Sequence, residues 1–99
     1  MQHDTDEEVE VLLKPIEPDK YKVIFLNDNV TTMQFVIEVL ILVFKKSYSE
    51  ANSIMIETHE KGKAVAGVYV YEIAEAKAIK AREMAKMKRF PLEVILEQE

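Results

Sequence analysis

The chain has 99 residues and 48% hydrophobic content, enough apolar material for one modest core and therefore for one domain. It contains no cysteine, which excludes disulfides, thiolate zinc sites and a cysteine nucleophile and fits a reducing cytosol. No apolar run approaches the roughly 20 residues that span a membrane and no signal peptide is recognisable, so we expect a soluble, cytoplasmic protein without membrane contacts.

The net charge of −5 is concentrated at the N-terminus. Residues 1–20 hold seven acids against two lysines, whereas residues 21–99 hold eleven charges of each sign. The acidic segment has too few apolar groups to offset its ordering entropy, so we predict a disordered, flexible extension over 1–19 before one folded domain over 20–99. Nucleic acid is excluded as a partner, because its affinity rests on cationic neutralisation of phosphates.

The folded part begins with a β-branched and aromatic run that predicts a strand over 21–26, followed by the turn-forming residues Asn27, Asp28 and Asn29. Thr31 with Gln34 three positions later matches a capping box, and the helical spacing of the apolar residues behind it predicts a helix over 32–45. Ser49 is expected to cap a second helix over 50–60.

Gly62 stands where a left-handed glycine ends a helix, and a strand is predicted over 63–71. An alanine-rich helix follows over 72–89 and ends before Pro91, and alternating residues predict a last strand over 92–97. The order is β-α-α-β-α-β. It predicts an α+β fold in which a three-stranded antiparallel sheet carries three helices on one face.

The most polar concentration after the extension is Asn27, Asp28 and Asn29 with Thr31, between the first strand and the first helix. Such residues favour turns and helix caps, and that role alone accounts for them. Alternatively, Asn27 and Asp28 present acceptor oxygens to a cation. An amine is the natural ligand, because charge-assisted hydrogen bonds are about twice as strong as neutral ones.

His59 lies one helical turn beyond Met55, with Thr58 beside it. A lone helical histidine is commonly just solvated, but neutral imidazole can also accept a hydrogen bond. Met33 and Met55 are flexible side chains that complete a core or line a pocket for several bulky groups. The lysines of the third predicted helix form either a solvated face or a docking surface for a large partner.

The sequence carries only weak signs of catalysis. It has no glycine-rich phosphate loop, no nucleophile elbow and no pair of histidines at ligand spacing. A hydrolytic set of Asp28, His59 and a threonine has no support from spacing. We predict no catalytic residues, no metal and no cofactor, in a protein that is not an enzyme.

The run over 21–40, YKVIFLNDNVTTMQFVIEVL, closely resembles the core signature of the ClpS family, the bacterial adaptors of the N-end rule pathway. The resemblance continues through Met55, through HEKGKAVAGVYVYEIAEAK over 59–77 and through Pro91-Leu92, and covers about residues 20–97. The ordered combination of Asn-Asp, Thr-x-Met, Met-x-x-x-His-x-x-Gly-Lys and Gly-Val is far more specific than any single piece.

The resemblance implies an adaptor that binds the free α-amino group and the bulky first residue (Leu, Phe, Tyr or Trp) of N-degron substrates. It implies delivery of these substrates to the N-terminal domain of the AAA+ unfoldase ClpA, with a part for the extension before Lys20. By the same resemblance, the ammonium is held by Asn27, Asp28 and His59. The apolar pocket is lined by Thr31, Met33, Val36, Met55, Thr58 and Leu92. The unfoldase contact uses Glu72, Lys77 and Tyr71.

The sequence departs from the family pattern at Asn29, where many members have a second acid, and at Thr58, which replaces an apolar residue of the pocket wall. The order of preference among first residues is therefore left open. A ribosome-stalk-like interaction domain, with a similar order of elements, is the alternative. It has no use for Asn27, Asp28 and His59 together.

Overall fold

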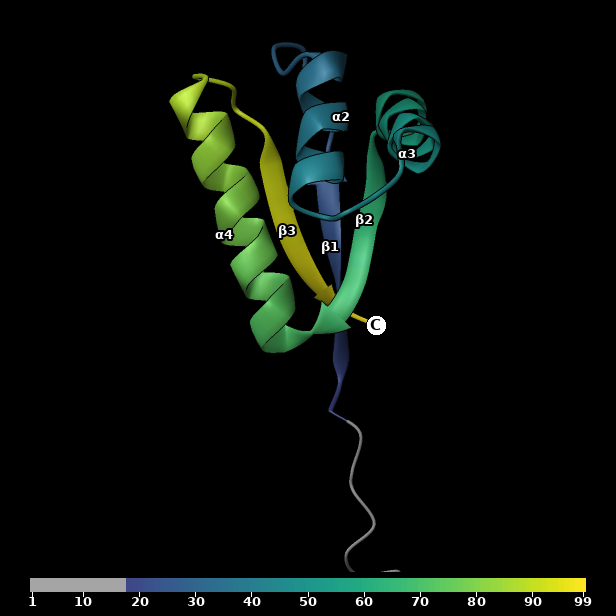
Figure 1. The fold of residues 1–99 in the computed structure, drawn as a ribbon, viewed down its shortest axis with the longest axis vertical. Coiled ribbons are helices and arrows are strands. Elements are labelled where there is room, and N and C mark those ends of the chain that lie inside the picture. The colour runs from purple at the N-terminus through teal and green to yellow at the C-terminus, as the bar shows by residue number, and fades with distance from the viewer. Residues whose placement is uncertain (1–17) are drawn as a thin grey trace, which may run out of the picture.

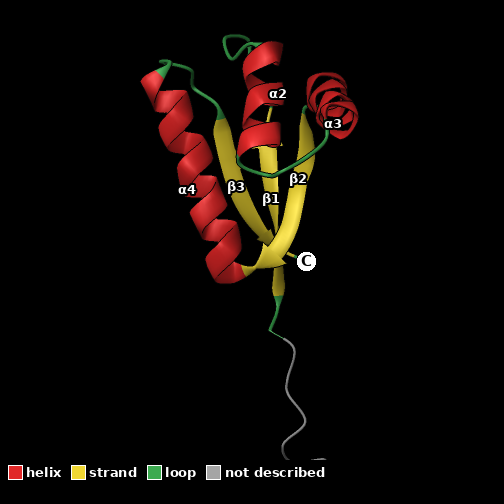
Figure 2. Ribbon diagram, in the orientation of Figure 1, coloured by secondary structure: helices red, strands yellow, loops and turns green. Residues whose placement is uncertain are grey.

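The structure is a computed structural model, and its described residues are 18–99. All but the last two residues of the predicted extension over 1–19 lie outside them. Figure 2 shows the strands and helices along the chain. They are β1 (Lys20–Leu26), α2 (Met33–Leu42), α3 (Tyr48–Lys61), β2 (Lys63–Val70), α4 (Tyr71–Met87) and β3 (Glu93–Gln98). The predicted element order is confirmed.

The three strands form one antiparallel sheet in the order β2-β1-β3, so the first strand of the chain is the central one. Ile24 in the middle of β1 is the partner of Val65 on one side and of Ile95 on the other. The register with β2 shifts by one residue between Val23 and Ile24. Such a bulge bends the strand and increases its twist.

Figure 1 shows α4, α2 and α3 side by side over one face of this sheet, as predicted. The alanine stripe of α4 is fully buried and lets that helix lie close to the strands: Ala74, Ala78, Ala81 and Ala85. Val23 and Phe25 of β1 point into the core between the sheet and the helices. The opposite face of the sheet stays open, because Val65, Val68 and Ile95 are each more than a third exposed.

Both predicted N-terminal caps were wrong by one or two residues. α2 is capped by Thr32, whose hydroxyl accepts from the Phe35 N–H, and Thr31 does not cap it. α3 is capped by Ser47, which forms a reciprocal capping box with Glu50 in place of the predicted Ser49. Thr32 and Ser47 both have the extended backbone that a cap requires, whereas Ser49 already lies within α3.

The predicted helix over 32–45 was too long at its end, because α2 stops at Leu42 and Lys45 adopts a left-handed backbone with φ 57°. α4 likewise ends at Met87, two residues before the predicted end, and Arg89 has φ 61°. Gly62 ends α3 with φ 88°, which confirms the predicted left-handed glycine. Among residues 18–99, no helix is long and apolar enough to cross a membrane.

Candidate functional site

The turn between β1 and α2 is organised around the carboxylate of Asp28. Its Oδ1 accepts hydrogen bonds from the backbone N–H groups of Val30 (2.8 Å) and Thr31 (2.6 Å). Its Oδ2 accepts from the Thr31 hydroxyl at 2.8 Å. Asp28 therefore does stabilise the turn, as one of the two interpretations of this residue predicted. A carboxylate has about four acceptor positions, so one remains for a further donor.

These contacts set the charge state of Asp28. Partial burial raises the pKa of this carboxyl, but the donors from Thr31 and Val30 together outweigh it and hold the pKa below its ordinary value of 3.8. Asp28 is thus an anion at neutral pH. Its negative charge lies half-buried at the mouth of a pocket, which is where a cationic ligand is attracted most strongly.

A backbone bond joins this turn to the end of α3. The Asn27 N–H donates to the Gly62 carbonyl at 2.8 Å, and the Gly62 N–H donates to the Thr58 carbonyl at 3.0 Å. The bond fixes the start of the turn against the last turn of α3, which carries His59. Residues that are about thirty positions apart in the chain are brought to one place by the glycine cap between them.

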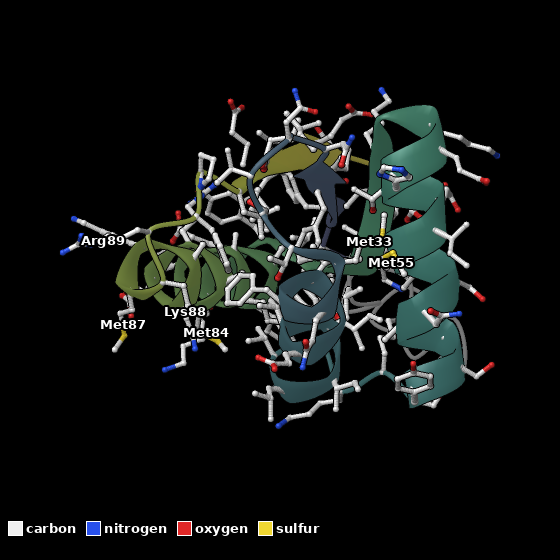
Figure 3. The ribbon with its side chains drawn as sticks, turned by 90° about the horizontal axis from the view of Figure 1, so that it is seen from above. Met33, Met55, Met84, Met87, Lys88 and Arg89 are labelled. Atoms are coloured by element: carbon white, nitrogen blue, oxygen red, sulfur yellow. The ribbon has the colours of Figure 1, made fainter. Side chains whose placement is uncertain are left out.

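A pocket of about 360 Å³ lies between this turn, the start of α2 and α3. Val36 and Met55 are buried in its wall, and Met33 is 47% exposed at its edge. Figure 3 shows Met33 and Met55 pointing toward one another across the space between the two helices. Thioether side chains at this position form an adaptable apolar edge beneath a polar mouth.

Thr58 contributes to the pocket wall as an apolar group. The residue is 3% exposed, and its hydroxyl donates to the Ile54 carbonyl one turn earlier in α3 at 2.8 Å. The hydroxyl is thereby satisfied within its own helix. The departure from the family pattern at this position introduces no unpaired polar atom into the pocket.

The pocket brings together eight of the nine residues that were predicted for amine and side-chain binding: Asn27, Asp28, Thr31, Met33, Val36, Met55, Thr58 and His59. Leu92 is not among the lining residues and lies in the main core cluster. The lining also includes Asn29, Val30 and Thr32, which were not predicted as site residues. Their position inside the turn, between predicted residues, was the signal that could have found them.

The residues predicted for the unfoldase contact lie at the start of α4, away from the pocket. Tyr71 and Glu72 are exposed there. The Tyr71 hydroxyl donates to the Glu75 carboxylate at 2.7 Å, and this bond together with the carboxylate charge raises the pKa of the tyrosine. Lys77 is half-buried, and its ammonium donates to the Val43 carbonyl at 2.7 Å. Lys77 therefore has a structural task in this fold.

The chemistry of the pocket is that of a receptor for a group that is cationic at one end and apolar at the other. The mouth offers carboxylate, amide and imidazole groups, and the wall offers thioether and aliphatic groups. No cluster of three or more potential metal ligands occurs within residues 18–99. A compact α+β scaffold carrying such a pocket defines a small ligand-binding domain.

A family model described as "ATP-dependent Clp protease adaptor protein ClpS" matches residues 16–95. The chain therefore belongs to the ClpS family of Clp protease adaptors. Among curated relatives, the ClpS of Acetivibrio thermocellus is 49% identical over 83 residues, which cover 84% of each chain. The ClpS of Wolinella succinogenes is 40% identical over 95 residues, which cover 96% of this chain and 93% of that protein.

A solved structure is also similar. It is the ClpS2 of Agrobacterium tumefaciens bound to L-phenylalaninamide, with 40% identity and a TM-score of 0.81, covering 84% of this chain and all of that one. L-phenylalaninamide has a free α-amino group on a residue with an aromatic side chain. Family membership rules against the ribosome-stalk-like alternative.

Proposed function

We propose that this protein is a cytoplasmic, non-enzymatic adaptor that binds the free α-amino group and the bulky first residue of substrate proteins. In this proposal Asn27, Asp28 and His59 hold the ammonium, and the pocket takes a Leu, Phe, Tyr or Trp side chain. The substrates are then delivered to the AAA+ unfoldase ClpA for degradation, with the extension over 1–19 taking part in delivery.

One observation carries the proposal: an ionised, half-buried carboxylate stands at the mouth of a pocket whose walls are apolar. Asp28 keeps one acceptor position beyond its three bonds to the turn. Asn27 and His59 supply further acceptors from the two segments that the Gly62 bond joins. An α-ammonium carries three donors, so three acceptors around it satisfy the group completely.

The energetics explain why both ends of the ligand are needed. Burial of a Phe or Leu side chain stabilises a complex by about 1.5–3 kcal/mol. Each hydrogen bond to a charged group contributes about 1.5–3 kcal/mol. Together, after the entropy of association is subtracted, these terms reach micromolar affinity, which corresponds to about 8 kcal/mol. An internal Phe lacks the ammonium and should be ignored.

The amine half is tested with fluorescent peptides that begin with Leu or Phe. Anisotropy should report binding of the free peptide and at least a tenfold weaker binding of its N-acetylated copy, because acetylation removes the charge and two donors. A peptide that begins with Ser serves as the control for the pocket. Equal affinities for free and acetylated Phe peptides would rule out recognition of the amine.

The delivery half concerns the exposed start of α4, where Tyr71 and Glu72 are free to meet a partner. Titration calorimetry with the N-terminal domain of ClpA should lose its signal for Glu72→Lys, while Leu-peptide binding is retained. The matched control is Glu97→Lys on β3, also exposed, which should bind the unfoldase domain normally. If both variants bind it normally, the contact lies elsewhere.

A further inference from the structure

A second concavity lies outside the amine pocket. It is a groove of about 460 Å³ between the C-terminal end of α2 and the middle of α4. Its apolar lining consists of Leu42, Val43, Ala76 and Met84, and all of its charged lining residues are lysines: Lys45, Lys77 and Lys80. A groove of this kind matches a ligand that is both apolar and acidic.

The groove continues as a stripe along α4. Ile73, Lys77, Lys80, Met84 and Met87 follow one another at spacings of four and three residues, so they share one face of the helix. Ile73 is 49% exposed and Met87 is 85% exposed, and Leu42 across the groove is 57% exposed. Figure 3 shows Met84 and Met87 projecting from α4 away from the sheet.

The chain itself contains a segment with the matching composition. Residues 1–17 hold six acids and one lysine, whereas residues 18–99 are balanced with twelve charges of each sign. Within that acidic stretch, residues 8–13 read EVEVLL, in which four apolar side chains accompany two glutamates. Apolar and acidic groups are thus combined within a span of six residues.

The attachment point lies close enough for this segment to reach the groove. The rings of Tyr21, at the start of β1, and Tyr71, at the start of α4, are 5.1 Å apart, so the chain enters the fold beside the first turn of α4 (Figure 1). From there to Met84 is about 20 Å along the helix at 1.5 Å per residue. Residues 9–13 lie five to nine positions before Pro18, which corresponds to at most about 17–32 Å of chain.

We propose that residues 8–13 of this chain dock in the groove between α2 and α4, with Val11, Leu12 and Leu13 against its apolar lining and the glutamates facing Lys45 and Lys80. Because the contact is intramolecular, the segment has an effective concentration in the millimolar range at the groove. Even a weak intrinsic affinity therefore gives a substantial docked fraction. The docking is a property of the isolated chain and does not depend on the proposed function.

The open face of the sheet is the competing surface, because Val65, Val68 and Ile95 are exposed on it. A pocket of about 250 Å³ there is lined by Glu57 and Glu97 as well as by lysines. A face that carries both signs does not favour an acidic segment as the lysine-lined groove does. This face therefore provides the internal control for the experiment.

The docking has a consequence that does rest on the proposed function. The groove includes Lys77, which was also predicted to contact the unfoldase. A docked segment and the unfoldase domain would then exclude one another, so binding of the unfoldase would release the extension for its part in delivery.

The experiment uses the absence of cysteine from the chain, since Thr5→Cys gives a unique site for a nitroxide label next to the acidic segment. In the full-length ¹⁵N-labelled protein, we expect the oxidised label to reduce the amide signals of Lys45, Lys80 and Met84 at least twofold relative to the reduced label. Amides of Val68 and Ile95 on the open sheet face should lose less than a quarter of their intensity. Equal attenuation on both faces would overturn the proposal.

Two full-length test variants and one matched control variant sharpen the result. The charge reversal Lys45→Glu with Lys80→Glu should restore the groove signals to the level of the sheet face, while the matched reversal Lys61→Glu with Lys63→Glu should leave the attenuation unchanged. Leu12→Ser with Leu13→Ser should also restore them. Persistence of the attenuation in the Lys45→Glu/Lys80→Glu variant or in the Leu12→Ser/Leu13→Ser variant contradicts the proposal. The proposal is also contradicted if the attenuation appears in a mixture of spin-labelled ¹⁴N chains with ¹⁵N chains that carry no spin label. That result would identify a second copy of the chain as the occupant of the groove.

Discussion

The ammonium of Lys77 donates a 2.7 Å hydrogen bond to the carbonyl of Val43, the residue that caps the C-terminal end of α2. The same ammonium lies 5.9 Å from the centre of the Phe44 ring and 5.3 Å from that of Tyr69. A cation at a helix C-terminus and over aromatic faces is favourable on both counts. Lys77 thus joins α4 to the end of α2.

This relationship predicts that Lys77→Met destabilises the fold by about 1–2 kcal/mol, because a hydrogen bond from a charged, half-buried group is lost while the stem is kept. Lys80→Met, one turn away and exposed, should change stability by no more than about 0.5 kcal/mol. Urea unfolding followed by circular dichroism measures both. If the two variants unfold at the same urea concentration, the bond contributes nothing. A binding defect of a Lys77 variant has to be corrected for this loss.

Two substitutions of Asp28 separate its effect on stability from its effect on binding. Asp28→Ala removes all three bonds to the turn and should cost about 1–2 kcal/mol of stability, as for other capping residues. Asp28→Asn keeps an oxygen for the two N–H groups, and its amide can donate to the Thr31 hydroxyl, so stability should fall by less than about 0.5 kcal/mol. The asparagine variant nevertheless loses the charge.

Peptide affinity therefore has to be measured in the asparagine variant. Its affinity for a free Phe peptide should fall at least tenfold, which is about 1.4 kcal/mol. Thermal unfolding of the same sample is the control. Unchanged affinity in the stable Asn variant would reduce Asp28 to a turn residue.

The lowered pKa of Asp28 predicts a pH dependence of stability with a definite sign. Since the folded protein binds this proton less readily than the unfolded chain, the contribution is complete above the ordinary value of 3.8 and is lost as the pH falls through the lower folded value. The difference in unfolding free energy between the parent protein and Asp28→Asn should be larger at pH 7 than at pH 2.5. Urea unfolding at both pH values tests this, and a constant difference would contradict it.

The sequence predicted the elements well because their signals are local. Apolar spacing identified α2, an alanine-rich pattern identified α4, and a β-branched and aromatic run identified β1. Gly62 marked the end of α3, and Pro91 marked the approximate end of α4. The caps were wrong because hydroxyl residues come in near-adjacent pairs, Thr31 with Thr32 and Ser47 with Ser49. In the first pair, the residue that caps the helix is the one whose hydroxyl is not already bonded. Thr31 is taken by Asp28, a contact that no helix pattern contains.

The residue types of the candidate site were predictable from the sequence, but the backbone contacts that bring them together were not. Residue types and the family resemblance predicted Asn27, Asp28 and His59 as site residues, and all three line the pocket. The bond from Asn27 to Gly62 that joins the turn to α3 links backbone groups, for which no side-chain pattern exists. The hydrogen bond from Lys77 to the Val43 carbonyl spans 34 positions, and no sequence pattern predicts it either. Leu92 was expected in the pocket because of the family resemblance alone. In the structure it is buried in the main core cluster and does not line the pocket.

Gly67 predicts a third effect on stability, since the Tyr69 ring lies over it. A Cβ atom added at Gly67 would stand 2.6 Å from ring carbons of Tyr69, too close for any real contact. Gly67→Ala should therefore push the ring off Lys77 and cost about 1–3 kcal/mol. In a Tyr69→Leu background the same change should cost less than half as much. A double-mutant cycle by urea unfolding measures this, and additive effects would contradict the ring contact.

Thr58 allows the pocket wall to be tested apart from the amine clamp. Its hydroxyl serves only the Ile54 carbonyl within α3, and the pocket holds no partner that a valine would leave unpaired. Thr58→Val should thus keep the fold intact and make the wall more apolar. Affinity for a Phe or Leu peptide should rise by up to about fourfold, the equivalent of one buried methyl-sized group. Affinity for the N-acetylated peptides should remain low, since the mouth is unchanged. If Thr58→Val changes the affinities for the free and the acetylated peptides by the same factor, the pocket wall and the amine-binding residues do not belong to one site.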